Sequence, residues 1–87
     1  MALRKTKTIN GVSGDYWVIM EKMYSKDMNA TLVSFRCYAS SEIRSSGIYN
    51  FIAMPEFFEY RQLPGDLTLA ECYAASKTDF FSDATDC

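Results

Sequence analysis

The chain has 87 residues, of which nine are basic and eleven acidic, so its formal net charge is −2. Binding to nucleic acids or to anionic membranes needs a clustered positive field, and this balance argues against both. An apolar fraction of 48% argues against disorder, and the length suits one domain, which we expect over residues 1–87. The one basic cluster (Arg4, Lys5, Lys7) is interpreted as a solvated strand, with a binding arm as the alternative.

Hydropathy and cysteine content predict the compartment. Uncharged apolar runs fall far short of the ~20 residues that span a bilayer, and no signal-peptide pattern opens the sequence. We therefore expect synthesis in the cytoplasm without membrane insertion. Three cysteines, an odd number, fit free thiols in a reducing compartment better than a disulfide scaffold. Cys37 and Cys72 are interpreted as small core residues, and Cys87 as an exposed inert thiol or, alternatively, a partner in an intermolecular disulfide.

The first elements predicted along the chain are two strands joined by a turn. Residues 2–9 alternate in character and predict a strand, and Asn10-Gly11 then gives a turn signal. Residues 16–24 are rich in aromatic and β-branched side chains, which favours a second strand over the alternative, a helix capped by Asp15. We expect one face of this strand to carry Trp17, Ile19 and Met23, and the other Tyr16, Val18 and Met20.

The middle of the chain predicts two further strands. Residues 31–39 alternate most clearly, after a polar turn at 25–27. A small polar connection with one helical turn is expected over residues 40–47. Residues 48–60 resemble another strand, but Pro55 cannot donate to a ladder, so this strand lies at an edge or contains a bulge.

The last part of the chain predicts a helix. After a turn at residues 63–66, Thr68 and Glu71 have the spacing of a capping box. An apolar stripe predicts a helix of about three turns, and residues 79–87 are allowed as an extended tail. The fold class expected is therefore α+β, a small antiparallel sheet of three to four strands with one C-terminal helix packed on it. The stripe consists of Leu69, Cys72, Tyr73 and Ser76.

The sequence contains no recognisable catalytic set. It has no histidine, which removes the commonest general base and metal ligand, and it has neither a CxxC spacing nor a nucleotide-binding glycine loop. Glu56 and Glu59 are interpreted as protection of an edge strand, with a catalytic carboxylate pair as the alternative. The aspartates near the end lack the pattern of a calcium loop. We expect no enzyme activity, no cofactor, no metal and no small-molecule substrate. These aspartates are Asp79, Asp83 and Asp86.

Thirteen aromatic residues are more than a core of this size can enclose. On a strand, neighbouring side chains point to opposite faces, so one ring of each adjacent pair can reach the surface. Burial in the core remains the alternative for each ring taken singly. The residues predicted to contact another chain are Tyr16, Phe58 and Tyr60, with Cys87 as the candidate for a disulfide between chains.

Two stretches that together cover about half the chain resemble small proteins encoded by tailed bacteriophages and prophages. The first is the opening Met-Ala-Leu-Arg-Lys-Thr with Asn10-Gly11 and the strand over residues 16–19; the second runs from residue 67 to 87. The matching motifs in the second stretch are Leu67-Thr68-Leu69, Cys72-Tyr73, Lys77, Phe80-Phe81 and Ala84-Thr85-Asp86-Cys87.

The resemblance implies a structural part of a virion, in a tail or baseplate rather than a head. It carries over no functional residues. The function predicted is a non-enzymatic subunit, made in the host cytoplasm, that packs against other virion proteins and copies of itself as a homo-oligomer. The alternative is a small phage-encoded regulator or inhibitor that binds a host protein.

Overall fold

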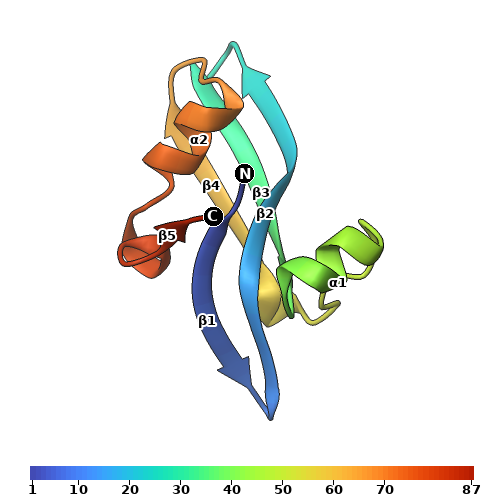
Figure 1. The fold of residues 1–87 in the computed structure, drawn as a ribbon. Coiled ribbons are helices and arrows are strands. Elements are labelled where there is room, and N and C mark those ends of the chain that lie inside the picture. Colours follow the sequence, from blue (N-terminus) through green and yellow to red (C-terminus); the bar gives the residue numbers. More distant parts are fainter.

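A five-stranded antiparallel sheet forms the body of the protein, in the computed structural model that describes residues 1–87 (Figure 1). The strand order is β4-β3-β2-β1-β5, so β4 and β5 are the two edges. Neither of the two short helices has the length or the apolar character to cross a membrane. The elements are β1 (Leu3–Ile9), β2 (Val12–Ser25), β3 (Ala30–Tyr38), α1 (Ser41–Ser46), η1 (Pro55–Phe57), β4 (Phe58–Pro64), α2 (Leu69–Ala75), η2 (Asp79–Phe81) and β5 (Thr85–Asp86).

The hairpin predicted at Asn10-Gly11 is confirmed, and the turn expected at residues 25–27 lies at residues 26–29. Asn10 and Gly11 have φ angles of 50° and 80°, the left-handed pair that a two-residue hairpin turn requires, and they join β1 to β2. Asn29, with φ 47°, ends the turn between β2 and β3. The sheet then curls so far that the Lys7 ammonium on β1 donates to the Glu56 carbonyl just before β4.

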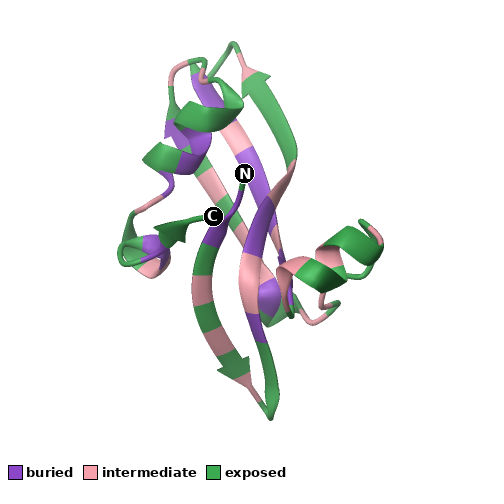
Figure 2. Cartoon of the chain, in the orientation of Figure 1, coloured by how far each residue is buried: buried purple, intermediate pink, exposed green.

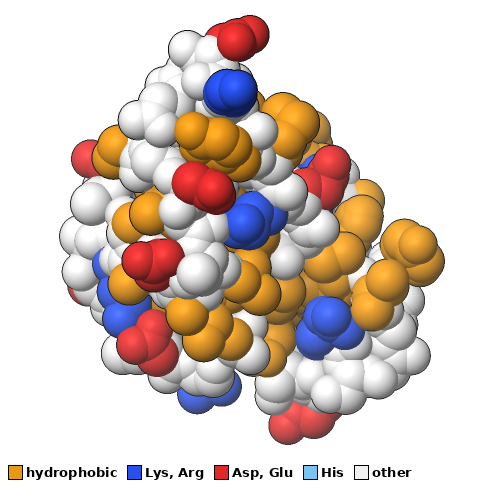
Figure 3. Space-filling model, turned by 90° about the horizontal axis from the view of Figure 1, so that it is seen from above, with side chains coloured by type: hydrophobic (Ala, Val, Ile, Leu, Met, Phe, Trp, Pro, Cys, Tyr) orange, Lys and Arg blue, Asp and Glu red, His pale blue; other side chains and the backbone are white.

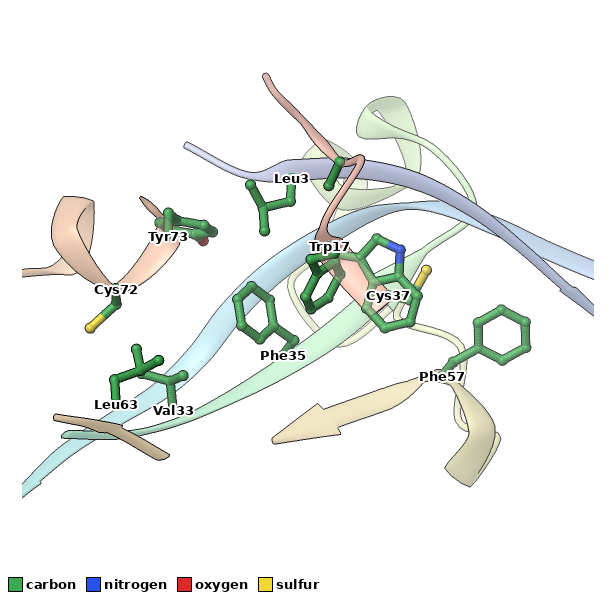
Figure 4. Close-up of a cluster of buried hydrophobic side chains, with 11 residues drawn as sticks. Leu3, Trp17, Val33, Phe35, Cys37, Phe57, Leu63, Cys72 and Tyr73 are labelled. Carbon is green, nitrogen blue, oxygen red and sulfur yellow. The ribbon is translucent and has the colours of Figure 1, made fainter. Parts of the chain in front are cut away.

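The inner face of the sheet carries the main core, which α2 and η2 cover (Figures 1 and 4). Trp17 lies at its centre, fully buried, and its indole N–H donates to the Lys5 carbonyl at 2.8 Å. The ring centroids of Phe80 and Phe81 lie 5.2 and 5.3 Å from that of Trp17, both in edge-on arrangements. Buried residues concentrate in β2, β3 and the inner side of α2 (Figure 2).

A bulge in β2 corrects the predicted faces of that strand. Ile19 pairs with Phe35, but Glu21 pairs with Ser34, so Met20 is an extra residue in the ladder. Because side chains alternate along a strand, one extra residue moves everything after it to the opposite face. Met23 therefore shares the outer face with Val18 and Met20, and not the inner face with Trp17 as expected.

The α+β class and the antiparallel sheet are confirmed, but the sheet has five strands rather than three or four. The fifth comes from residues 79–87, allowed as an extended tail, in which β5 pairs with β1. A second helix, α1, follows β3. Residues 48–54 are not a strand: Pro55 starts η1, and the ladder begins only at Phe58.

The predicted capping box is present, because Thr68 and Glu71 each accept from the other's backbone N–H, at 3.2 and 2.9 Å. Of the predicted stripe, Cys72, Tyr73 and Ser76 are buried and Leu69 is exposed. The helix has seven residues, which is about two turns rather than three.

Candidate functional site

The outer face of the sheet divides into a covered half and an open half. Around Tyr38, the chain covers its own rings: the Tyr38 hydroxyl donates to the Ile48 carbonyl, and the Phe51 ring lies 6.4 Å away, edge-on. Tyr38 is fully buried, and burial raises the pKa of its hydroxyl above the ordinary value. Residues 40–51, which include α1, thus close one end of this face with a second, smaller apolar cluster.

The other half of this face is open. Strands β2, β3 and β4 form there a shallow groove of about 810 Å³, called here the outer groove. Met23 and Tyr60 are 60% and 63% exposed in it, although both are large apolar side chains. Figure 3 shows hydrophobic side chains at the surface on the α1 side of the molecule, around single charged groups. The groove is lined by the apolar residues Met20, Met23, Leu32, Val33 and Tyr60 and by the polar or charged residues Glu21, Lys22, Ser34, Arg61 and Gln62.

Arg36 lies between the two halves. Its guanidinium carbon is 4.2 Å from the centroid of the Phe58 ring and 5.8 Å from that of Tyr60, distances at which a cation is attracted to a ring face. One nitrogen lies 3.8 Å from a Glu21 carboxylate oxygen, and another donates to the Phe35 carbonyl. Arg36 is half-buried and holds the rings of β4 in place without adding a free charge to the groove.

The three rings predicted to contact another chain all lie on this outer face. Tyr60 is in the open half and freely exposed. Phe58 is half-buried beneath Arg36 and beside Phe51, whose ring centroid is 5.9 Å away. Tyr16, opposite Tyr38 in the ladder, is half-buried against the smaller cluster. The structure therefore brings Phe58 and Tyr60 together on β4 and places Tyr16 two strands away on β2.

Cys87 lies at the opposite edge of the sheet from these rings. Its backbone N–H and C=O pair with Ala2, both at 3.1 Å, and its side chain is exposed. Cys37 and Cys72 are buried, as expected for small core residues. Burial raises the pKa of the Cys37 thiol to about 12 and raises that of Cys72 above its ordinary value. Both thiols therefore stay protonated near neutral pH and are poor nucleophiles.

The acidic residues considered as ligands or catalysts have other surroundings. Asp83 accepts from the Lys5 ammonium at 2.6 Å, which lowers the pKa of its carboxyl, and Asp86 accepts from Lys77 at 2.8 Å. These pairs fasten residues 79–87 to the rest of the chain. No three histidine, cysteine, aspartate or glutamate side chains group closely enough to hold a metal ion.

The sequence analysis missed Arg36, Met20 and Met23 as members of this surface. The signal for Arg36 was present, since a long cation on the most regular strand must find partners on one sheet face. Met20 was predicted on the same face as Tyr16 and Val18, which is correct, but Met23 was predicted on the opposite face because no residue in β2 signals the bulge. Comparison with known proteins adds no further residues: no family model, no curated protein and no solved structure matches the chain.

Proposed function

We propose that this protein is a non-enzymatic structural subunit of a tailed-bacteriophage particle, in the tail or baseplate region. It packs its outer groove against a neighbouring virion protein. The observation that carries the packing role is the open half of the outer face. The chain covers the other half of this face with its own α1 segment, but no segment of the chain covers Met23 and Tyr60.

The side chains of the outer groove suit a protein partner. Methionine is unbranched and polarizable and adapts to irregular surfaces, and tyrosine is enriched at interfaces because it combines a large apolar ring with a polar end. The Glu21 carboxylate already lies beside the Arg36 guanidinium. That carboxylate is therefore already compensated when a partner covers this half of the face. Lys22 and Arg61 also line the groove and belong to no ion pair, so a partner that places a carboxylate there lowers the cost of their desolvation.

The phage setting rests on the resemblance of the two terminal stretches to small virion proteins. Part of the second stretch has a structural reason in this fold, because Thr68 caps α2 while Phe80 and Phe81 close the core over Trp17. The resemblance supports a particle component made in the host cytoplasm. The competing role, a regulator that binds a host protein, needs the same kind of surface but a different partner.

Mass spectrometry of purified particles of the phage that encodes the chain tests this proposal. We expect the wild-type protein in many copies and at least a tenfold loss for Met23→Glu, which places a charge in the groove. Met28→Glu is the matched control, since Met28 is 51% exposed but lies in the turn before β3, outside the groove. Absence of the wild-type protein from particles, with recovery of a host protein instead, would support the regulator and refute the subunit.

A further inference from the structure

Strand β4 lies at an edge of the sheet. Its pairing register with β3 determines which of its backbone N–H and C=O groups point away from β3. Leu63 pairs with Thr31, and the Gly65 N–H donates to the Asn29 carbonyl at 2.8 Å, which continues the same series of hydrogen-bonded pairs. In an antiparallel ladder such residues alternate with residues whose N–H and C=O point away. The outward-facing residues of β4 are therefore Phe58, Tyr60 and Gln62.

These outward groups are available to a further strand. The Phe58 N–H is used by the Pro55 carbonyl, but the Phe58 carbonyl and both backbone groups of Tyr60 and Gln62 face outward. The Tyr60 carbonyl accepts only from the flexible Arg61 side chain, at 3.0 Å on the exposed edge. An extended segment alongside β4 could replace that bond with main-chain hydrogen bonds.

The charges on β4 are unpaired within the chain. Glu59 and Arg61 are opposite Phe35 and Val33, so both lie on the inner face, and neither belongs to any of the ion pairs in the structure. The Arg61 Nε atom is buried without a hydrogen-bond partner, while the guanidinium carbon lies 5.1 Å from the Phe81 ring centroid. A partner strand that supplied a carboxylate here would give the Arg61 guanidinium the opposite charge that the chain itself does not supply.

A second copy of β4 can supply this carboxylate from its own Glu59. Of the two-fold registers centred near the middle of the strand, only one places Glu59 opposite Arg61. In a two-fold antiparallel pair centred on Tyr60, Glu59 of each copy lies opposite Arg61 of the other. A pair centred one residue away places Glu59 opposite Glu59 or Arg61 opposite Arg61, and like charges directly opposite are destabilising. The register centred on Tyr60 also lets each Gln62 N–H donate to the Phe58 carbonyl of the other copy.

We infer that β4 is a self-pairing edge: two copies of this chain join through antiparallel β4 strands, with Tyr60 opposite Tyr60, into one continuous sheet. The inference rests on the proposed role as an assembly subunit and names a second copy as one partner. The pairing uses the outward-facing backbone groups of β4. Each copy contributes the same strand to this two-fold contact, so the assembly closes as a dimer rather than growing into a fibre.

Charge reversal tests the pairing by sedimentation of the full chain. At high concentration the wild type should approach twice the 9.9 kDa of one chain. Glu59→Arg alone and Arg61→Glu alone should stay monomeric, because each places like charges opposite one another. An equimolar mixture of the two variants, and the double variant, should regain the dimer. A wild type that stays monomeric to millimolar concentration, or single variants as dimeric as the wild type, would overturn the inference.

A cross-link tests the register without changing a charge. In the proposed pair the two residues at position 60 have Cα atoms about 5.5 Å apart, within the range of a disulfide. In a Cys87→Ser background, Tyr60→Cys should form an oxidised dimer and Gln62→Cys should not. The reverse pattern would refute this register. Neither test touches Met23, so a failure here leaves the particle-incorporation result, and with it the proposed function, to stand or fall separately.

Discussion

The two faces of the sheet carry similar apolar and aromatic side chains, but one face is covered and the other is partly open. The inner face is closed by α2 and η2, and its rings contact one another around Trp17. The outer face is closed only where residues 40–51 fold over Tyr38, and beyond Arg36 it is left open. An apolar strand face therefore becomes buried core or open surface, depending on whether another segment of the chain covers it. The composition predicts more apolar side-chain surface than one small core can enclose, but it does not indicate which strand face stays open.

The largest expected difference between the two faces is in how much free energy of unfolding is lost when a large side chain is replaced by alanine. Trp17→Ala removes the ring that Phe57, Phe80 and Phe81 pack against, and should lower the free energy of unfolding by about 3–5 kcal/mol. Met23→Ala, on the open half, should stay within about 0.5 kcal/mol of the wild type. Urea unfolding of both variants measures this. Equal losses would mean that the open half is part of the stabilising core.

A substitution on the inner face, where residue 52 packs against the sheet, should have an intermediate effect. A Cβ on Gly14 would lie 2.6 Å from the Cys37 sulfur and 2.7 Å from the Ile52 Cδ1 atom, closer than packed atoms approach. Gly14→Ala should therefore destabilise the fold by about 1–3 kcal/mol, the usual cost of overpacking.

Denaturant melts in two backgrounds test the cause of this loss. The combined Cys37→Ala and Ile52→Val changes remove both clashing atoms, so the alanine at position 14 should cost less there than in the wild type. A cost of the same size in both backgrounds would assign the effect to the backbone instead of to the contact.

The smallest expected effect concerns the helix that covers the inner face. Thr68→Ala removes the side-chain oxygen that accepts from the Glu71 N–H, and should cost about 0.5–2 kcal/mol. Thr78→Ala is the matched control, because Thr78 also precedes a helical turn but its side chain makes no capping hydrogen bond. Thermal melts should show a lower midpoint for the first variant only. Equal midpoints for the two variants would remove the cap as a source of stability.

The sequence predicted the features that depend on neighbours in the chain. The Asn10-Gly11 hairpin, the alternation of β3 and the Thr68–Glu71 capping box all arise from local conformational preference or from hydrogen bonds over three residues. The outer location of Phe58 and Tyr60 followed from alternation alone. The strand predicted over residues 48–60 was wrong at residues 48–54. The composition of this segment suits a strand, but a strand forms only where a neighbouring strand supplies hydrogen-bond partners.

Length and charge, together with these local signals, determined an α+β protein with excess aromatic surface. The tertiary structure decided what no short segment contains: the extra residue at Met20, the return of β5 to β1, and the cover that α1 gives to half of a face. Each is a contact between segments distant in the sequence, and its free energy depends on surfaces that exist only once the chain has folded. The position of the outer groove is therefore a property of the sheet and its covering segments together.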